Sequence, residues 1–188
     1  VESATLVFGD IDNDNDQDVL ITGTDDSNNF LISLYINDGI GNYSLDIVND
    51  FETASHGSAS AFADIDNDND LDLIIGRFLY TNDGNGNYSL IAGTPFYGFV
   101  NEIKFADVDN DNDQDIMTLS LNSGDSTKLF INDGDGNFTY DSSQNLTQLW
   151  FGDIEFGDID NDNDLDVLIS GRVNNPSEFY SNLYRNDG

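Results

Sequence analysis

The feature that most constrains this chain is an acidic motif of nine residues that occurs four times. The string Asp-Ile-Asp-Asn-Asp-Asn-Asp-Gln-Asp begins at Asp10, and closely similar strings begin at Asp64, Asp107 and Asp158. The four starting points are 54, 43 and 51 residues apart. A period of this length is typical of repeat architectures, in which each copy is one supersecondary unit.

A second motif recurs out of phase with the first. Asn-Asp-Gly occurs at residues 37–39, 82–84, 132–134 and 186–188. Three copies continue as Gly-Asn-aromatic, at residues 41–43, 86–88 and 136–138. Two independent motifs that repeat in the same order exclude chance, and the chain is therefore predicted to contain four copies of one unit.

Each unit is predicted to contain four short strands. An alternating run precedes the acidic motif, as at residues 4–8 or 102–106, and an apolar run such as residues 19–21 or 73–75 follows it. Runs this short and rich in branched residues favour buried strands over helices. A third strand ends at the Asn-Asp-Gly turn, where Gly supplies the positive φ of a hairpin. A fourth strand begins at Tyr43, Tyr88 or Phe138.

These strands predict an all-β fold, a β-propeller built of four-stranded antiparallel blades. The region spans residues 1–188, with repeats at approximately 1–50, 51–95, 96–145 and 146–188, the last of which lacks its fourth strand. An incomplete blade would expose a strand edge. We therefore expect a part of a larger propeller, with further blades or domains in the same polypeptide, and a self-contained four-bladed ring is the alternative.

The charge balance excludes several classes of partner. The chain has 37 acidic and 5 basic residues, and its formal net charge is −32. Because so negative a field repels phosphate and anionic lipid, we expect neither nucleic acid nor a membrane surface as a partner. No apolar run approaches the ~20 residues of a membrane helix, so direct membrane insertion is not expected. The absence of Cys excludes thiolate zinc sites, thiol catalysis and disulfides.

The acidic motifs themselves are predicted to be metal sites. The first contains Asp10, Asp12, Asp14, Asp16 and Asp18. Carboxylates ~4 Å apart repel by about 1 kcal/mol in water and by more near a protein surface, so a cation among them is favoured. Their spacing resembles the first part of an EF-hand loop, in which Asp10, Asp12, Asp14 and Asp18 would give side-chain oxygens and Asp16 its backbone carbonyl. A solvated acidic loop is the alternative.

Calcium is favoured over other metals by the type of ligand. The motifs offer only hard oxygen ligands, without the His or Cys that zinc or copper prefers, and magnesium takes fewer carboxylates. An EF-hand is excluded because its twelfth position needs a Glu, whereas this chain has Ile21, Ile75, Thr118 and Ile169 there. The sixth position needs a left-handed residue, and Asn occupies it in all four motifs. Those residues are Asn15, Asn69, Asn112 and Asn163.

The repeats resemble a known family. The segment from Phe62 to Gly76, Phe-Ala-Asp-Ile-Asp-Asn-Asp-Asn-Asp-Leu-Asp-Leu-Ile-Ile-Gly, is similar to the FG-GAP/VCBS repeat of integrin-alpha-like propellers, as are residues 8–23, 105–119 and 156–171. The chain departs from that family where Asn replaces the usual loop Gly, and where the FG-GAP phrase is reduced to Phe-Gly-Asp or Phe-Ala-Asp. The resemblance implies calcium-binding propellers, in many cases seven-bladed, on secreted and cell-surface proteins.

The resemblance also implies the ligands and their place in the blade. The loop would join the first two strands of each blade, and about four Ca²⁺ would bind, one per repeat. The implied ligands are Asp10, Asp12, Asp14, Asp16, Asp18, Asp64, Asp66, Asp68, Asp70, Asp72, Asp107, Asp109, Asp111, Asp113, Asp115, Asp158, Asp160, Asp162, Asp164 and Asp166.

Other residues give weaker signals. His56 is the only His and is expected to be a surface or packing residue. The aromatic residues at 150–151 and 96–99 are expected to pack between blades, and stacking on sugar rings is the alternative. Glycosylation sequons begin at Asn42, Asn87, Asn137 and Asn145, and turn chemistry explains the first three.

The resulting expectation is a non-enzymatic, calcium-binding propeller of an extracellular protein, secreted or on the cell surface. Its role would be adhesion or recognition, with a protein or a glycan as the partner. A lectin with sugar sites at the blade edges is one alternative. The other is an accessory or catalytic propeller of a secreted polysaccharide-degrading enzyme, which would need a cleft that combines His56, Lys104 or an Arg with carboxylates.

Overall fold

The computed structural model describes all residues except 1, 28, 53–58, 99, 121–126 and 174–177. His56 therefore lies outside the described residues. The described residues form 15 strands and no helix. They therefore contain no helix that could cross a membrane. The chain divides into two compact units, unit 1 (Val1–Phe99) and unit 2 (Val100–Gly188), which are described one at a time.

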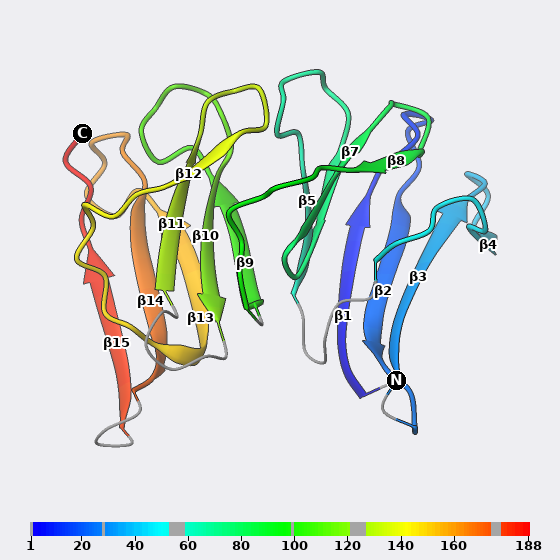
Figure 1. Cartoon of the computed structure of the whole chain (residues 1–188). Helices are drawn as coiled ribbons and strands as arrows, with labels where there is room; N and C mark the ends of the chain where they lie inside the picture. The colour runs from blue at the N-terminus through cyan, green and yellow to red at the C-terminus, as the bar shows by residue number, and fades with distance from the viewer. Residues whose placement is uncertain (1, 28, 53–58, 99, 121–126, 174–177) are drawn as a thin grey trace. The chain divides into compact units, whose positions relative to one another are not determined.

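Unit 1 consists of two four-stranded antiparallel sheets (Figure 1). Blade 1 contains β1 (Glu2–Gly9), β2 (Asp18–Thr24), β3 (Phe30–Asn37) and β4 (Tyr43–Leu45). Blade 2 contains β5 (Ser60–Ala63), β6 (Asp72–Ile75), β7 (Phe78–Asn82) and β8 (Tyr88–Leu90). In both sheets the strands lie side by side in chain order.

Unit 2 repeats this plan with one strand fewer. Blade 3 contains β9 (Val100–Ala106), β10 (Asp115–Ser120), β11 (Thr127–Asn132) and β12 (Phe138–Tyr140). Blade 4 contains β13 (Trp150–Gly157), β14 (Asp166–Arg172) and β15 (Phe179–Tyr184). The up-and-down order of four antiparallel blades confirms the predicted all-β propeller class. The strand starts predicted at Tyr43, Tyr88 and Phe138 are also confirmed.

The two repeated motifs are the turns of each blade. Residues at the two ends of every acidic loop pair across the first two strands, as Gly9 pairs with Asp18 and Ala63 with Asp72. The third and fourth strands are joined by the Asn-Asp-Gly turn, where Asn82 pairs with Tyr88. In this turn Gly84 has φ 75°, which a residue with a Cβ rarely adopts. The hairpin and the acidic loop therefore recur at fixed places in each sheet.

The sequons are part of the hairpin chemistry. The side-chain amide of Asn42 donates to Asp38 Oδ2 at 2.8 Å, and that of Asn87 donates to Asp83 Oδ2 at 3.0 Å. Asn137 makes the same contact with Asp133 at 3.2 Å. The Asn of each of the first three sequons therefore has a structural role in its turn, as predicted.

The second strand of each blade lies at the centre of its sheet. All four residues of β6 and all six of β10 are buried, which explains why these runs are apolar without alternation. Each unit has its own apolar cluster. The buried members in unit 1 are Ile11, Leu20, Leu34, Leu73, Ile75 and Tyr80. Those in unit 2 are Met117, Leu119, Leu129, Leu149, Ile154, Val167 and Ile169. Both clusters draw on two blades, so each blade buries its face against its neighbour.

We expect Leu73→Ala to lower the free energy of unfolding by about 2–5 kcal/mol, because Leu73 is fully buried and its loss leaves a cavity. Leu90→Ala is the matched control, since Leu90 is 45% exposed in the same blade. Urea unfolding at fixed calcium measures both variants. Equal losses in the two would contradict the assigned core.

Candidate metal centre

Each acidic loop is shaped by Asn residues in the left-handed region. Asn15, Asn69, Asn112 and Asn163 have φ between 72° and 77°, which confirms the prediction for the sixth position. The fourth position is left-handed as well, with φ from 60° to 65° at Asn13, Asn67, Asn110 and Asn161. This second left-handed position was not predicted, although Asn recurs there in every motif. Asn tolerates positive φ better than most residues with a Cβ, so alternate Asn residues coil the loop.

The first Asp of each loop holds the coil closed from within. In loop 1, Asp10 Oδ1 accepts the N–H of Asp14 at 3.1 Å and Oδ2 accepts that of Asn15 at 3.0 Å. Asp14 Oδ1 in turn accepts the N–H of Asp16 at 2.9 Å. The other three loops make the same three bonds within 0.1 Å of these lengths. The geometry therefore belongs to the motif and not to one loop.

The Asp at the ninth position of each loop is buried and accepts hydrogen bonds from two turns. Asp18 is 0% exposed; its Oδ2 accepts the N–H of Ile11 at 3.0 Å and its Oδ1 that of Asn37 at 2.8 Å. The first donor belongs to the acidic loop and the second to the Asn-Asp-Gly turn. Asp72, Asp115 and Asp166 are 1% exposed and make the equivalent pairs of bonds.

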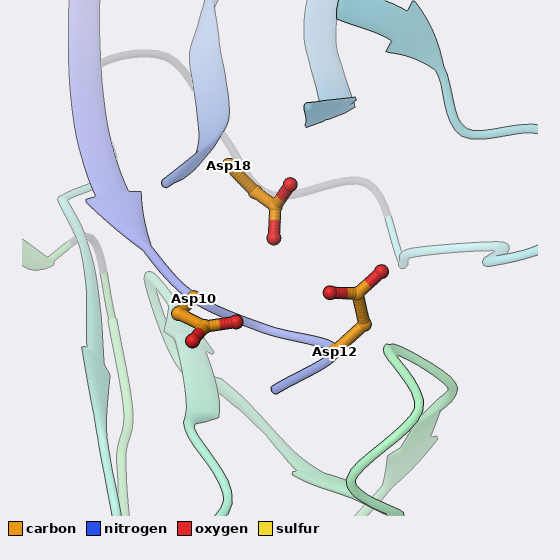
Figure 2. Close-up of side chains that lie close together, drawn as sticks. All are labelled: Asp10, Asp12 and Asp18. Atoms are coloured by element: carbon orange, nitrogen blue, oxygen red, sulfur yellow. The ribbon is translucent and has the colours of Figure 1, made fainter. Parts of the chain in front are cut away.

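The loop brings three of its five carboxylates together. In blade 1 these are Asp10, Asp12 and Asp18, and one oxygen from each lies within 4.8 Å of the others. Figure 2 shows the three side chains around a common space at the end of β1. The equivalent groups are Asp64, Asp66 and Asp72; Asp107, Asp109 and Asp115; and Asp158, Asp160 and Asp166. An Asp-rich group in each blade is thus arranged so that it could hold a metal ion.

In three of the four loops, the Asp at the third position carries an oxygen that lacks a protein partner. Oδ1 of Asp12, Asp66 and Asp160 is buried and makes no hydrogen bond. Burial raises the pKa of Asp12 above its usual range, and the negative charge of Asp14 raises it further. The pKa of Asp66 is raised for the same reasons, by burial and by Asp68. A buried carboxylate oxygen without a donor is unfavourable unless a cation or water meets it.

Burial also changes the pKa of the Asp at the ninth position. It raises the pKa of Asp72 to about 7 and that of Asp115 to about 6, although two backbone N–H groups oppose the rise in each case. The pKa of Asp166 is instead lowered, because the N–H groups of Asn186 and Ile159 outweigh burial there. Without a cation, Asp72 and Asp115 therefore keep their protons to a higher pH than an ordinary Asp does.

The Asp residues at the fifth and seventh positions lie outside the groups that the Asp residues at positions one, three and nine form. The fifth residue of loop 4, Asp162, forms a separate group with Asp160 and Asp187. The seventh carboxylate lies against the Gly of the hairpin turn, as Asp70 does at Gly84. It also accepts from the loop of the preceding blade in the same unit. Asn13 donates to Asp70 Oδ1 at 2.7 Å in unit 1, and Asn110 donates to Asp164 Oδ1 at 2.5 Å in unit 2.

A further contact between blades comes from the Asn of the Asn-Asp-Gly turn. The Asn82 amide donates to the Ile11 carbonyl at 2.7 Å in unit 1, and that of Asn186 donates to the Val108 carbonyl at 2.7 Å in unit 2. The sequence analysis assigned this Asn only to a turn. Its repetition was the available signal, but a single sequence does not reveal which neighbour it reaches.

The other residues singled out from the sequence are placed as follows. Phe96 is 3% exposed, so stacking of this ring on a sugar is excluded, whereas Tyr97 and Phe151 are exposed. Lys104 on β9 lies 3.3 Å from Glu155 and 4.0 Å from Glu102. Glu102 lies on β9 itself and Glu155 on β13, which contacts β9 in unit 2, and partly exposed pairs of this kind are ordinary surface ion pairs.

Comparison with known proteins identifies a repeat family and structural similarity to a solved protein. The FG-GAP-like repeat matches residues 10–75 and 107–169. No curated protein matches the chain. Among solved structures, the chain is similar to the V. cholerae biofilm matrix protein Bap1, with 14% sequence identity and a TM-score of 0.41. That match covers 95% of this chain and 37% of the other.

The match to the FG-GAP-like repeat covers more than half of the chain and includes all four acidic loops. The same loops join the first two strands of each blade, as the resemblance implied. The chain belongs to the FG-GAP-like repeat family.

Proposed function

We propose that the chain is a calcium-binding β-propeller module of a secreted or cell-surface protein. One structural Ca²⁺ per blade would hold the acidic loop, and the surfaces of the blades would serve adhesion or recognition. The observation that carries this proposal is that the carboxylates at positions one, three and nine lie close together in all four loops.

The donor set fits calcium. Only carboxylate and carbonyl oxygens are available, and Ca²⁺ takes six to eight oxygen ligands in flexible geometry. The unpartnered Oδ1 of Asp12 supplies one free ligand atom. Each oxygen of Asp18 accepts one N–H, and a carboxylate has about four lone-pair sites, so both oxygens retain room for a metal. The carboxylate at the fifth position and the backbone carbonyl at the seventh would complete the coordination shell.

The proposed ion would stabilise two turns, the acidic loop and the Asn-Asp-Gly turn. It would offset the repulsion among carboxylates that lie within 4.8 Å of one another. Through Asp18 it would also fix the Asn-Asp-Gly turn, because the Asn37 N–H donates to the same carboxylate. An ion that binds only the folded state stabilises that state by mass action. Sites of this type in extracellular modules have dissociation constants on the order of 10⁻⁴–10⁻³ M, which favours an extracellular location.

The recognition role is supported by exposed aromatic residues away from the loops. In unit 2, Phe151 is 56% exposed and has φ 50°, at an irregularity in the pairing of β13 with β14. Positive φ is unusual for a bulky residue and is often found at functional sites. In unit 1, Tyr97 is 75% exposed. We infer a non-enzymatic module in which such rings contact a protein or a glycan.

We expect Ca²⁺ to raise the melting temperature of the metal-stripped protein, because at 100 times the dissociation constant each site should add about 2.7 kcal/mol to the free energy of unfolding. Asp66→Asn should remove one bound ion, because the unpartnered oxygen of Asp66 becomes a weaker neutral ligand. Asp26→Asn, which removes an exposed charge outside the loops, is the control. Calorimetry and equilibrium dialysis measure these effects. An unchanged ion count in Asp66→Asn would contradict the ligand assignment.

We also expect the effect of pH on stability to depend on calcium. Because the folded pKa of Asp72 is about 7 against an ordinary 3.8, metal-free folded protein holds a proton that the unfolded chain releases. That stabilisation is complete below pH ~3.8 and is lost as the pH rises to about 7. The metal-free protein should therefore melt at a higher temperature at pH 5 than at pH 7.5. Saturating Ca²⁺ should oppose this trend, since the metal needs the carboxylate. A metal-free melting temperature that rises with pH would refute this prediction.

The glycan version of the recognition role predicts calcium-dependent binding to one class of sugar on a glycan array. Phe151→Ala should weaken that binding, and Leu168→Ala, an exposed apolar residue on the adjacent β14, is the control. A blank array from protein that is folded and loaded with calcium would exclude the glycan version and favour a protein partner.

A further inference from the structure

Two buried hydroxyl groups lie between the blades of unit 1. Thr22 of β2 is 1% exposed and Ser60 of β5 is 7% exposed. Neither Thr22 Oγ1 nor Ser60 Oγ has a hydrogen-bond partner among the residues that the structure describes. A buried hydroxyl without a partner is costly, and native proteins nearly always satisfy such groups with protein atoms or with ordered water.

Both side chains lie on the surfaces through which blades 1 and 2 contact each other. Residues two apart in a strand share a face of the sheet, so Thr22 lies on the face of Leu20, which belongs to the apolar cluster that the two blades share. Ser60 likewise lies on the face of Phe62, which packs against the same cluster and lies close to Gly9 of β1. The strands β1 and β5 are in contact (Figure 1). The two hydroxyls therefore belong to one interface.

Unit 2 has apolar residues at the corresponding positions. Thr22 is four residues after the Asp at the ninth position of its loop, as Leu119 is in blade 3. Ser60 is four residues before the first Asp of its loop, as Ile154 is in blade 4. The strand registers agree at these positions. Leu119 and Ile154 are fully buried in the apolar cluster of unit 2. Unit 1 therefore has a pair of hydroxyls where unit 2 has a pair of apolar side chains.

This difference provides room as well as polar groups. Thr and Ser are together smaller than Leu and Ile by more than one methyl group, and one water molecule takes about 30 Å³ in the liquid. The pairing of β1 with β2 is also irregular between Glu2 and Thr5, and Thr5 is the residue opposite Thr22. Such an irregularity leaves backbone groups outside the regular ladder. Backbone groups next to Thr22 can therefore supply a third hydrogen-bond partner.

We propose that blades 1 and 2 bind an internal water molecule between Thr22 and Ser60. The water accepts a hydrogen bond from each hydroxyl and donates one to a backbone carbonyl, and about three hydrogen bonds are usual for a buried water. It connects β2 to β5 across the interface, whereas the corresponding positions in unit 2 are apolar. This proposal goes beyond the function proposed above and does not rest on the identity of the metal.

A crystal structure of the full chain, at a resolution that shows ordered water, tests the site directly. We expect one well-ordered water at about 2.5–3.0 Å from both Thr22 Oγ1 and Ser60 Oγ. In solution, NMR should show a cross-peak between a long-lived water and the methyl group of Thr22. No such water is expected beside Leu119, which is the internal control in unit 2.

Removing one hydroxyl distinguishes a group bonded to water from an unpaired group. Thr22→Val keeps the shape of the side chain, and we expect it to lower the melting temperature by about 2–4 °C, because a hydrogen bond is lost. If the hydroxyl had no partner, the same change would raise the melting temperature. Thr139→Val is the matched control, since Thr139 is exposed on β12, and it should have a smaller effect.

A double-mutant cycle tests whether one water serves both hydroxyls. Ser60→Ala should also lower the melting temperature. Combined with Thr22→Val, it should cost less than the sum of the two single changes, because either change already weakens the same bridge. In the control cycle, Thr22→Val is combined with Ser44→Ala at an exposed position on β4, and the two effects should add. Calorimetry in saturating calcium measures all variants.

Three results would overturn the proposal. The first is a crystal structure without ordered water between the two hydroxyls. The second is a higher melting temperature of folded Thr22→Val. The third is strict additivity of Thr22→Val and Ser60→Ala. Circular dichroism checks that each variant folds, and the NMR cross-peak tests the site without any substitution.

Discussion

The fold of every blade depends on a buried carboxylate at the end of its acidic loop. Asp18 and its counterparts are almost fully buried, and each accepts one N–H from the loop and one from the Asn-Asp-Gly turn. One side chain therefore fixes two turns that lie 19 residues apart in the chain. A buried charge is costly unless it is paired, and two backbone donors compensate only part of that cost for Asp72, whose pKa is raised to about 7. A bound cation would remove the remainder.

The same turns also connect neighbouring blades. Asn82 reaches the carbonyl of Ile11 and Asn13 reaches the carboxylate of Asp70, so the loop of one blade and the hairpin of the next are linked in both directions. Unit 2 has the equivalent bonds from Asn186 and Asn110. The proposed metal sites, the turns and the packing between blades therefore share residues. A substitution in one loop should therefore destabilise the adjacent blade as well as its own.

Much of the fold and of the candidate site could be predicted from the repeat. The strand order, both turns and the left-handed sixth position followed from Asp, Asn and Gly at fixed spacing, because these residues act on their own backbone. What could not be predicted depends on contacts between residues far apart in the chain. Phe96 is buried, as expected, whereas Tyr97 beside it is exposed, and the sequence does not separate the two. Lys104 meets Glu155 only because β9 and β13 lie close together. The contacts of Asn82 and Asn13 were missed for the same reason.

The sequence alone determined the number of repeats, the blade topology and the residues of the acidic loops, because local turn chemistry and the apolar runs leave few alternatives. Only the tertiary structure decided which carboxylates converge. Asp10, Asp12 and Asp18 group together, while Asp16 lies against the turn at Gly39, because β-pairing of Gly9 with Asp18 sets where the loop closes.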